Sequence, residues 1–305
     1  MGRAPGRRAV LIAGPTASGK SALALARAEA EGGVIVNTDA LQVYSGLRLI
    51  TARPGDGELA RAPHRLYGEV APSLRFSTGA WVRAAAAIIA ASGDAPLFFV
   101  GGTGLYFEAL IAGLADVPEV PPAALAAAEA EIAGLDREAR GRLIAARDPL
   151  IAARLRAPDP QRVARALAVL DATGRSLAEF QDTRAEGLLA GFEVERIVLN
   201  PDRDVLRDRI ARRFEAMFAG GAIEEVRALL ALGLDPALPA MKAIGVPEIG
   251  ALLRGEIGVA EAIARAVTAT RQYAKRQRTW FRGRMADWTW IDPSRPDAGA
   301  VRAVP

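Results

Sequence analysis

The chain alternates short, wholly apolar segments with longer stretches in which apolar residues recur at helical spacing. The apolar segments cover residues 9–14, 33–39, 96–102, 192–200 and 288–292, and turn-forming residues bound each of them. Runs of this length without polar alternation are typical of strands that are buried on both faces of a sheet. Strand and helix in alternation predict an α/β domain, built on a largely parallel sheet that helices flank.

One interval between predicted strands is too long for a single crossover helix. A proline-rich segment, residues 114–122, leads into a stretch rich in Ala, Glu and Arg that has no strand pattern. Alanine, glutamate and arginine all favour helix. We therefore predict an all-helical insertion at residues 117–187, an α/β core formed by residues 1–116 and 188–305, and a hinge at the proline-rich entry.

Composition narrows the classes of protein that this chain can be. Of its 305 residues, 51% are hydrophobic and 24% are charged, which is typical of a folded protein. No apolar run reaches the ~18 residues of a membrane span and no targeting segment precedes the first strand, so we expect a cytoplasmic protein. The lack of cysteine excludes disulfides and zinc–cysteine sites, and a structural role is expected for the one histidine, His64. A net charge of +4 permits a nucleic-acid partner without requiring one.

A phosphate-binding loop follows the first predicted strand. The segment GPTASGKS fits the pattern G-x-x-x-x-G-K-S and opens a predicted helix, which is the setting that this motif needs. Its glycines let backbone amides point at an anion, and the helix N-terminus adds partial positive charge. Lys20 is expected to reach the terminal phosphate, and the Ser21 hydroxyl to hold a magnesium ion. The predicted phosphate-binding residues are Gly14, Pro15, Thr16, Ala17, Ser18, Gly19, Lys20 and Ser21.

The next candidate strand tip lacks the acid that an ordinary NTPase uses to hold its metal. Residues 97–103 read LFFVGGT, so the strand ends in glycine and threonine. This favours a loop that holds a diphosphate leaving group over one that holds ATP, although small-molecule kinases also vary here.

Asp39 stands at the C-terminal tip of the second predicted strand, where ligands collect in open parallel sheets. A carboxylate beside a diphosphate suits a general base, but an aspartate before an apolar segment is also a common helix cap, and spacing leaves both open. Gln42 is placed to hydrogen-bond a base edge. Thr103, at the next strand tip, can bind a phosphoryl oxygen or belong to a tight turn that needs glycine.

A basic helix is predicted near the C-terminus, at residues 270–284. Projected at ~100° per residue, Arg271, Lys275, Arg278 and Arg282 form one stripe, with Tyr273 and Trp280 on the opposite side. No acid lies among them, which favours contact with a phosphate backbone or the donor diphosphate over a solvated surface. Elsewhere, Gln161 with Arg162 and Arg165 in the insertion, and the pair Arg212 and Arg213, are weaker signals.

These segments together resemble the tRNA dimethylallyltransferase family from about residue 10 to residue 292. The matching motifs, in family order, are GPTASGKS, DALQVY, TARP, APHRLYG, VGGTGLYFEALIAGL, DPQRVARAL, RRFEAMFAGGAIEEV, AIGVPEI and TRQYAKRQRTWFR. Three positions depart from the family pattern: Ala40 stands where the family usually has serine, Ile50 where it has glycine and Val246 where it has tyrosine.

The resemblance implies transfer of a dimethylallyl group from dimethylallyl diphosphate to the exocyclic N6 amine of the adenine on the 3′ side of the anticodon in tRNA. It implies Mg²⁺ as cofactor, with Ser21 as its ligand, and Asp39 as the group that accepts the adenine proton. Lys20, Thr16 and the loop amides would stabilise the leaving diphosphate, helped by Thr103 and Arg213.

The resemblance also implies an RNA interface on both predicted domains, with the anticodon stem-loop as partner, no protein partner and a monomeric enzyme. The implied tRNA-binding residues are Asp39, Ala40, Leu41, Gln42, Thr103, Gln161, Arg162, Val163, Ala164, Arg165, Lys242, Gly245, Lys275, Arg276, Arg278, Trp280 and Arg282.

Three alternatives compete with this interpretation. A small-molecule kinase would use the same loop for ATP and Mg²⁺, with Arg162 and Arg165 as its lid. A prenyltransferase of free adenine nucleotides would need neither the basic helix nor the large insertion. An RNA-binding module with a regulatory loop would bind tRNA without forming a product.

Overall fold

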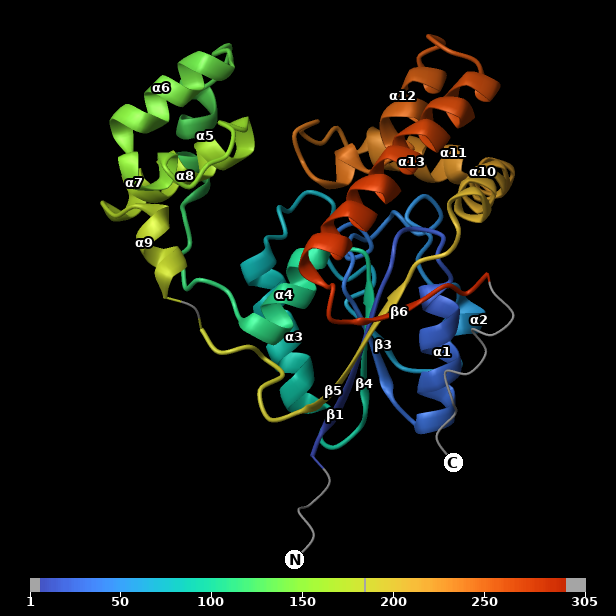
Figure 1. Ribbon diagram of the computed structural model, residues 1–305. Coiled ribbons are helices and arrows are strands. Elements are labelled where there is room, and N and C mark those ends of the chain that lie inside the picture. Colours follow the sequence, from blue (N-terminus) through green and yellow to red (C-terminus); the bar gives the residue numbers. More distant parts are fainter. Residues whose placement is uncertain (1–5, 184, 295–305) are drawn as a thin grey trace, which may run out of the picture. The chain divides into compact units, whose positions relative to one another are not determined.

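The five segments predicted as strands, together with one short strand that was not predicted, form a six-stranded sheet in a computed structural model that describes residues 6–183 and 185–294. All neighbouring strands are parallel, in the order β3-β2-β4-β1-β5-β6 (Figure 1). The strands are β1 (Arg8–Ala13), β2 (Val34–Asn37), β3 (His64–Arg65), β4 (Leu97–Gly101), β5 (Glu193–Leu199) and β6 (Thr289–Ile291). The predicted α/β class with a parallel sheet is confirmed.

The register brings the loops of four strands to one edge of the sheet. In β1, Ile12 is level with Val100 of β4 on one side and with Ile197 of β5 on the other. In β2, Asn37 is level with Val100. Because parallel strands end at the same edge, the segments that follow β1, β2, β4 and β5 meet there.

Helices cover both faces of this sheet. Figure 1 shows α1 (Lys20–Glu31) on one face, with α3 (Thr78–Ala91) and α4 (Gly104–Ala112) on the other. The inner side of α1 packs Ala24, Leu25 and Ala28 onto apolar residues of β1, β2, β4 and β5. The remaining helices of this part are α2 (Asp56–Leu59), α10 (Arg203–Ala219), α11 (Ala222–Ala231), the 3₁₀ turn η1 (Ala240–Lys242), α12 (Val246–Leu253) and α13 (Val259–Arg284).

The sequence pattern did not predict β3, which has two residues and no apolar run. His64 lies in β3, where its Nδ1 is 2.8 Å from the carbonyl oxygen of Ala62 and its ring meets that of Tyr67 edge to face. The strand forms because His64 and Arg65 pair with Ile35 and Val36 of β2. Pairing of this kind is a tertiary contact without a local signal.

The chain divides into two compact units, one formed by the residues up to Leu110 and from Leu189, the other by Ile111–Leu188. In the described part of the second unit, every regular element is a helix: α5 (Pro122–Glu131), α6 (Arg137–Arg147), α7 (Pro149–Ala152), α8 (Pro160–Thr173) and α9 (Leu177–Asp182). This unit has its own apolar core, to which α8 contributes Val163, Ala164 and Leu167. A buried Asp148 accepts hydrogen bonds from the Ser176 hydroxyl at 2.7 and 2.9 Å and from the Ile151 amide at 3.1 Å.

Two of the departures from the family pattern lie in the core of the first unit. Ile50 and Val246 are both buried. Ile50 fills the space above Gly245, where an added Cβ would lie 2.3 Å from the Ile50 Cδ1 atom. Val246 therefore belongs to the packing at the start of α12 and presents no side chain to a partner.

No described helix combines the length and apolar character that crossing a membrane requires.

Candidate functional site

The phosphate-binding loop connects β1 to α1 at the shared edge of the strands. Gly14 permits a close approach, because a Cβ there would lie 2.6 Å from the Ser18 hydroxyl and 2.8 Å from the carbonyl oxygen of Leu199. Ala17 (φ 64°) and Gly19 (φ 92°) both adopt left-handed backbone. A non-glycine residue in that region is uncommon, and such strain clusters at ligand sites. The Ser18 hydroxyl is buried and has no hydrogen-bond partner among the described residues.

Three charged residues of the predicted site, Lys20, Asp39 and Arg213, lie at or near this loop. Arg213 on α10 donates to the Thr16 hydroxyl, with 2.6 Å between Nη2 and Oγ1. Lys20 lies at the start of α1 and its Nζ is 3.3 Å from the carbonyl oxygen of Pro15. Burial lowers the pKa of Lys20 to about 8; the negative charge of Asp39 opposes the shift and the positive charge of Arg213 adds to it. Burial also lowers the pKa of Arg213, again opposed by Asp39. The loop is therefore a confined cationic site with one carboxylate near it.

A buried glutamine on α13, Gln277, ties the loop to the neighbouring strand. Its Oε1 accepts from the Thr16 amide at 3.0 Å and its Nε2 donates to the Gly102 carbonyl at 3.0 Å. Gly102 has no room for a side chain, since a Cβ would lie 2.0 Å from Gln277 Nε2. The role of Gln277 was not predicted from the sequence. A polar residue at a buried helix position, between two basic neighbours, was the signal that could have found it.

Asp39 follows β2 in a turn, so it does not cap a helix, and that alternative is wrong. The Asp39 amide donates to Asn37 Oδ1 at 2.8 Å, and one carboxylate oxygen, Oδ1, accepts from the Leu41 amide at 3.0 Å. The other oxygen, Oδ2, has no hydrogen-bond partner in the described part of the chain. Asn37 is itself held by the carbonyls of Asp39 and Leu66, both at 2.9 Å from its Nδ2. The carboxylate is thus oriented with one oxygen available for chemistry.

Thr103 joins the turn after β2 to the tip of β4. Its amide donates to the Thr38 carbonyl at 3.1 Å, and its hydroxyl oxygen accepts from the Ala40 amide at 3.0 Å. The hydroxyl proton of Thr103 is left to donate to a ligand. Gly101 and Gly104 make this possible, because a Cβ would lie 2.3 Å from the Thr38 backbone at the first position and 2.2 Å from the Trp280 ring at the second.

Three tyrosines from separate segments lie close enough to Asp39 for its negative charge to shift their pKa. The pKa of each hydroxyl is raised, first by burial and then by the negative charge of Asp39, so all three stay neutral near pH 7. They are Tyr67, Tyr106 and Tyr273. Tyr106 stacks on the buried Trp81 with 4.2 Å between ring centroids, which fixes its position.

Other predicted residues lie elsewhere or are already engaged. Both amide hydrogens of Gln42 are used by the carbonyls of Thr51 (2.8 Å) and Ala52 (3.0 Å), which leaves only its oxygen for a base edge. On α8 of the helical unit, Gln161 and Arg162 are exposed and Arg165 is partly exposed, whereas Val163 and Ala164 are buried in that unit's core. Lys242 is exposed at the end of η1, and Gly245, which precedes α12, is buried.

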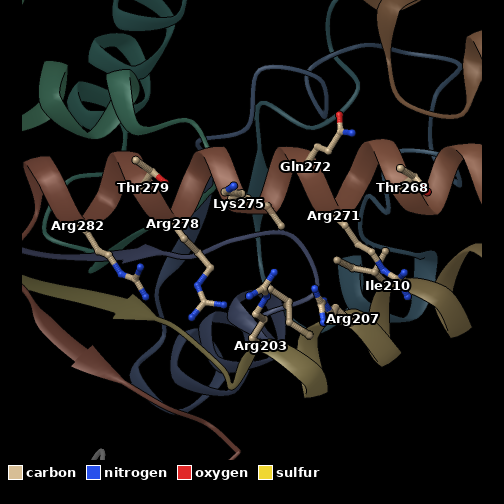
Figure 2. A pocket seen from close by; sticks show the side chains of 12 residues that line it. Arg203, Arg207, Ile210, Thr268, Arg271, Gln272, Lys275, Arg278, Thr279 and Arg282 are labelled. Atoms are coloured by element: carbon tan, nitrogen blue, oxygen red, sulfur yellow. The ribbon is translucent and has the colours of Figure 1, made fainter.

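The basic stripe lies along one side of α13 as the helical projection predicts. Arg271, Lys275, Arg278 and Arg282 all line a groove of about 480 Å³ between α13 and α10 (Figure 2). Two further arginines, Arg203 and Arg207, enter this groove from α10. A second hollow, beside the groove on the same helix, is lined by Gln272, Lys275, Arg276, Thr279 and Trp280. The buried side of α13 is formed by Thr270, Ala274, Gln277 and Phe281, whereas Tyr273 and Trp280, placed by the projection opposite the basic stripe, are partly buried.

A parallel sheet that presents a glycine-rich phosphate loop, two cations and an oriented carboxylate at one edge defines a P-loop α/β enzyme for a phosphorylated substrate. Within that class, the chain belongs to the IPP transferase family, whose sequence profile matches residues 42–284. A profile described as isopentenyl transferase matches residues 7–70.

Relatives of high identity support this assignment over more than nine-tenths of the chain. A protein of Chelativorans sp. (strain BNC1), called tRNA dimethylallyltransferase, is 53% identical over 283 residues, which cover 92% of this chain and 97% of the relative. One of Rhizobium meliloti (strain 1021), with the same name, is 48% identical over 293 residues, 95% of this chain and 96% of the relative.

Solved structures have the same fold. The full-length tRNA isopentenylpyrophosphate transferase of Bacillus halodurans superposes with a TM-score of 0.65 at 33% identity, over 94% of this chain and 90% of that one. A eukaryotic dimethylallyltransferase acting on tRNA superposes with a TM-score of 0.78 at 24% identity, over 94% of this chain and 74% of that one.

Proposed function

We propose that this chain transfers a dimethylallyl group from dimethylallyl diphosphate to the N6 amine of the adenine that follows the anticodon in tRNA. Its relatives are tRNA dimethylallyltransferases. The observation that carries the proposal is the convergence of the phosphate loop, Lys20, Arg213 and a carboxylate with one free oxygen at a single sheet edge.

In the proposed reaction, the loop binds the diphosphate of the donor. Lys20, the Thr16 hydroxyl, the loop amides and Arg213 stabilise the negative charge that grows on the diphosphate as the allylic carbon–oxygen bond breaks. The Thr103 hydroxyl donates from the tip of the neighbouring strand β4. Lys20 can stabilise this charge at neutral pH, because with a pKa of about 8 it is mostly protonated at pH 7.

The acceptor amine needs a base and an aligned approach. The N6 nitrogen forms a bond to the first prenyl carbon, the carbon–oxygen bond to diphosphate breaks, and one N6 proton passes to the free oxygen of Asp39. An adenine amine is a weak nucleophile, so alignment contributes as much as basicity. The base has to leave the anticodon-loop stack to reach the carboxylate.

A magnesium ion fits this site. The Ser21 hydroxyl lies exposed in the first turn of α1 with no hydrogen-bond partner in the described chain. No cluster of three or more His, Cys, Asp or Glu side chains that could hold a metal occurs among the described residues. A loop magnesium needs none, because it takes most of its ligands from substrate oxygens and water. When bound, the ion neutralises charge on the leaving diphosphate.

The tRNA contacts are proposed on two surfaces. On the first unit, Lys275, Arg276, Arg278, Trp280, Arg282 and Lys242 would hold the anticodon stem-loop, with residues 39–42 and Thr103 close to the target base. On the helical unit, Gln161, Arg162 and Arg165 would contact its backbone. We further propose that the enzyme acts in the cytoplasm and without a protein partner.

The decisive experiment supplies unmodified tRNA and dimethylallyl diphosphate labelled in its prenyl group, then digests the RNA to nucleosides. Label on N6 of the adenine next to the anticodon is the expected result. A parallel reaction receives ATP labelled in its γ-phosphate. Phosphate transfer without prenyl transfer would show that the protein is a kinase. Label on free adenine nucleotides alone would show that these, and not tRNA, are the acceptor. Binding of tRNA without any product would show an RNA-binding module that is not an enzyme.

A further inference from the structure

The groove between α10 and α13 concentrates unpaired positive charge. Six cationic side chains line it: Arg203, Arg207, Arg271, Lys275, Arg278 and Arg282. Within residues 6–183 and 185–294, only Arg207 among them has an ion pair, with Asp204 at 3.2 Å. Arginines elsewhere on the chain are commonly paired, such as Arg27 with Glu195 at 2.7 Å and Arg154 with Asp182 at 2.9 Å. Five of the six cations in the groove therefore have no ion-pair partner among the described residues.

Repulsion inside the groove shows how closely the cations are set. The pKa of Arg278 is lowered, first by partial burial and then by the positive charge of Arg282, with a smaller contribution of the same sign from Arg203 on the opposite wall. The carboxylates of Asp202 and Asp292 oppose these effects without cancelling them. Figure 2 shows the guanidinium groups of Arg203, Arg207 and Arg278 directed into the space between the two helices. A bound polyanion would relieve this repulsion.

The length of the groove indicates how extended that anion is. From Arg271 to Arg282 the cationic edge of α13 covers three turns, or ~16 Å at 1.5 Å per residue. On α10, Arg203 and Arg207 stand one turn apart and form the facing wall. A single diphosphate would engage only part of this surface, whereas successive phosphates of a nucleic-acid strand can engage all of it.

The groove is also continuous with the surface already proposed to hold the anticodon stem-loop. Gln272, Lys275 and Thr279 line both this groove and the hollow that contains Arg276 and Trp280. An RNA strand seated against Trp280 and Arg276 would thus meet Lys275 on the ridge of α13 and pass from there to the second row of cations.

We infer that Arg203 and Arg207 on α10, together with Arg271 on α13, form an outer binding site for the RNA phosphate backbone that extends the tRNA interface across α13. This inference rests on the proposed function and deepens it by adding a wall that no tRNA-binding motif of the sequence includes. The site recognises backbone charge and has no base-reading groups, so it raises affinity for any tRNA without selecting among sequences.

The test compares the double variant Arg203→Ala/Arg207→Ala with the wild-type chain. Affinity for unmodified tRNA is measured by fluorescence anisotropy over a series of salt concentrations. We expect binding to weaken about three- to tenfold at low salt, and the slope of log K against log[salt] to fall in magnitude by ~1.4–1.8, because two phosphate contacts of ~0.7–0.9 each are lost. Both side chains are exposed, so the fold should tolerate the change, which a thermal melt checks.

A charge-matched control is Arg227→Ala/Arg265→Ala. It removes two exposed arginines outside the groove, each paired with a nearby glutamate, Glu224 and Glu261. The control is expected to keep the wild-type slope. An equal slope and affinity in the test and control variants would overturn the inference. So would a raised KM for dimethylallyl diphosphate with an unchanged tRNA slope, because the groove would then serve the donor.

Failure of the inference and failure of the proposed function give different results. If the wild-type protein forms prenylated tRNA and the α10 variant binds tRNA normally, only the proposed outer site is rejected. If the wild-type protein forms no prenylated tRNA, the proposed function itself is rejected, whatever the variant does.

Discussion

At the scale of single residues, the site depends on side chains that have one atom held and another left free. Asp39 gives one oxygen to the Leu41 amide and keeps the other available. Thr103 accepts through its oxygen from Ala40 and keeps its proton for a ligand. Thr16 is held by Arg213 through its hydroxyl and by Gln277 through its amide. Fixing one end of each group restricts its orientation before substrate arrives, which lowers the barrier to an aligned reaction.

Replacing Asp39 with asparagine tests the proposed base. The amide oxygen can still accept from Leu41, so the turn should persist, but the proton acceptor is lost. We expect kcat to fall by ~10²–10⁴ and tRNA affinity to change less than about threefold, measured by single-turnover transfer and by anisotropy. A loss of tRNA affinity as large as the loss of turnover would show that the carboxylate positions RNA instead.

The pH dependence of donor binding tests Lys20. With its pKa lowered to about 8, Lys20 is charged below that pH and loses its proton above it. Donor affinity, measured by calorimetry, should therefore fall as pH rises from 8 to 9.5. In the variant Lys20→Arg the cation does not titrate, so this part of the fall should disappear; an identical profile would place the titration elsewhere.

The same lowered pKa has the opposite effect on the stability of the free protein. In the unfolded chain Lys20 keeps its proton up to its ordinary pKa of 10.5, so between about 8 and 10.5 the unfolded state binds more protons than the folded one. The contribution of Lys20 to the free energy of unfolding should thus rise with pH across this window. Chemical denaturation of the wild type and of Lys20→Met at pH 7.5 and pH 10 isolates this contribution. From pH 7.5 to pH 10, the free energy of unfolding should change in favour of the wild type relative to the variant.

At the scale of elements, α13 serves the loop and the proposed RNA surface at the same time. Gln277 on its buried side holds the Thr16 amide and the Gly102 carbonyl, while Lys275 and Arg278 lie at the groove. Trp280 rests against Gly104 in the turn after β4. A rigid helix links these contacts, so RNA bound to its basic side acts on the same element that holds the phosphate loop.

Replacing Gln277 with leucine should show this connection. The change leaves the Thr16 amide and the Gly102 carbonyl unpaired in a buried place, at ~1–3 kcal/mol each. We expect the free energy of unfolding to drop by about 2–6 kcal/mol and the KM for the donor to rise. Gln277→Glu keeps the acceptor for Thr16 but loses the donor to Gly102, so an intermediate effect on KM is expected. If both variants lose stability and the KM for the donor is unchanged, Gln277 contributes to folding and not to donor binding.

At the scale of the whole molecule, the second unit is a self-contained addition to the sheet unit. Its points of departure and return are adjacent, because the Leu189 amide donates to the Leu110 carbonyl at 3.1 Å. Each unit has a core of its own. The loop, Asp39, Thr103, Arg213 and Gln277 all belong to the first unit.

Joining Leu110 to Leu189 through a short Gly-Ser linker should therefore leave a folded protein. We expect it to retain cooperative unfolding and donor affinity within about threefold, since the diphosphate site is intact. Affinity for tRNA should fall at least tenfold, because Arg162 and Arg165 are removed. The measurements are a thermal melt, donor calorimetry and tRNA anisotropy. Undiminished tRNA affinity would show that the insertion does not contribute to tRNA binding.

The sequence by itself determined the features that depend on neighbouring residues along the chain. Apolar runs predicted five of the six strands, all but β3. The placement of Asp39 and Thr103 after strands predicted that they would lie near the loop, because parallel strands share one edge. The stripe of Arg271, Lys275, Arg278 and Arg282 followed from helical periodicity alone. The family resemblance rests on motifs of the same local kind.

Only the tertiary structure decided which distant side chains complete the site. Gln277 meets Thr16 from 261 positions away, and Arg203 faces the basic stripe because α10 packs beside α13. Tertiary packing likewise buried Val163 and Ala164, and committed both amide hydrogens of Gln42 to carbonyls. Periodicity reports which side of an element is apolar, but it does not report which partner covers that side. Partner choice is set by long-range packing and by the need of buried polar groups for hydrogen bonds, and neither leaves a mark in the local pattern.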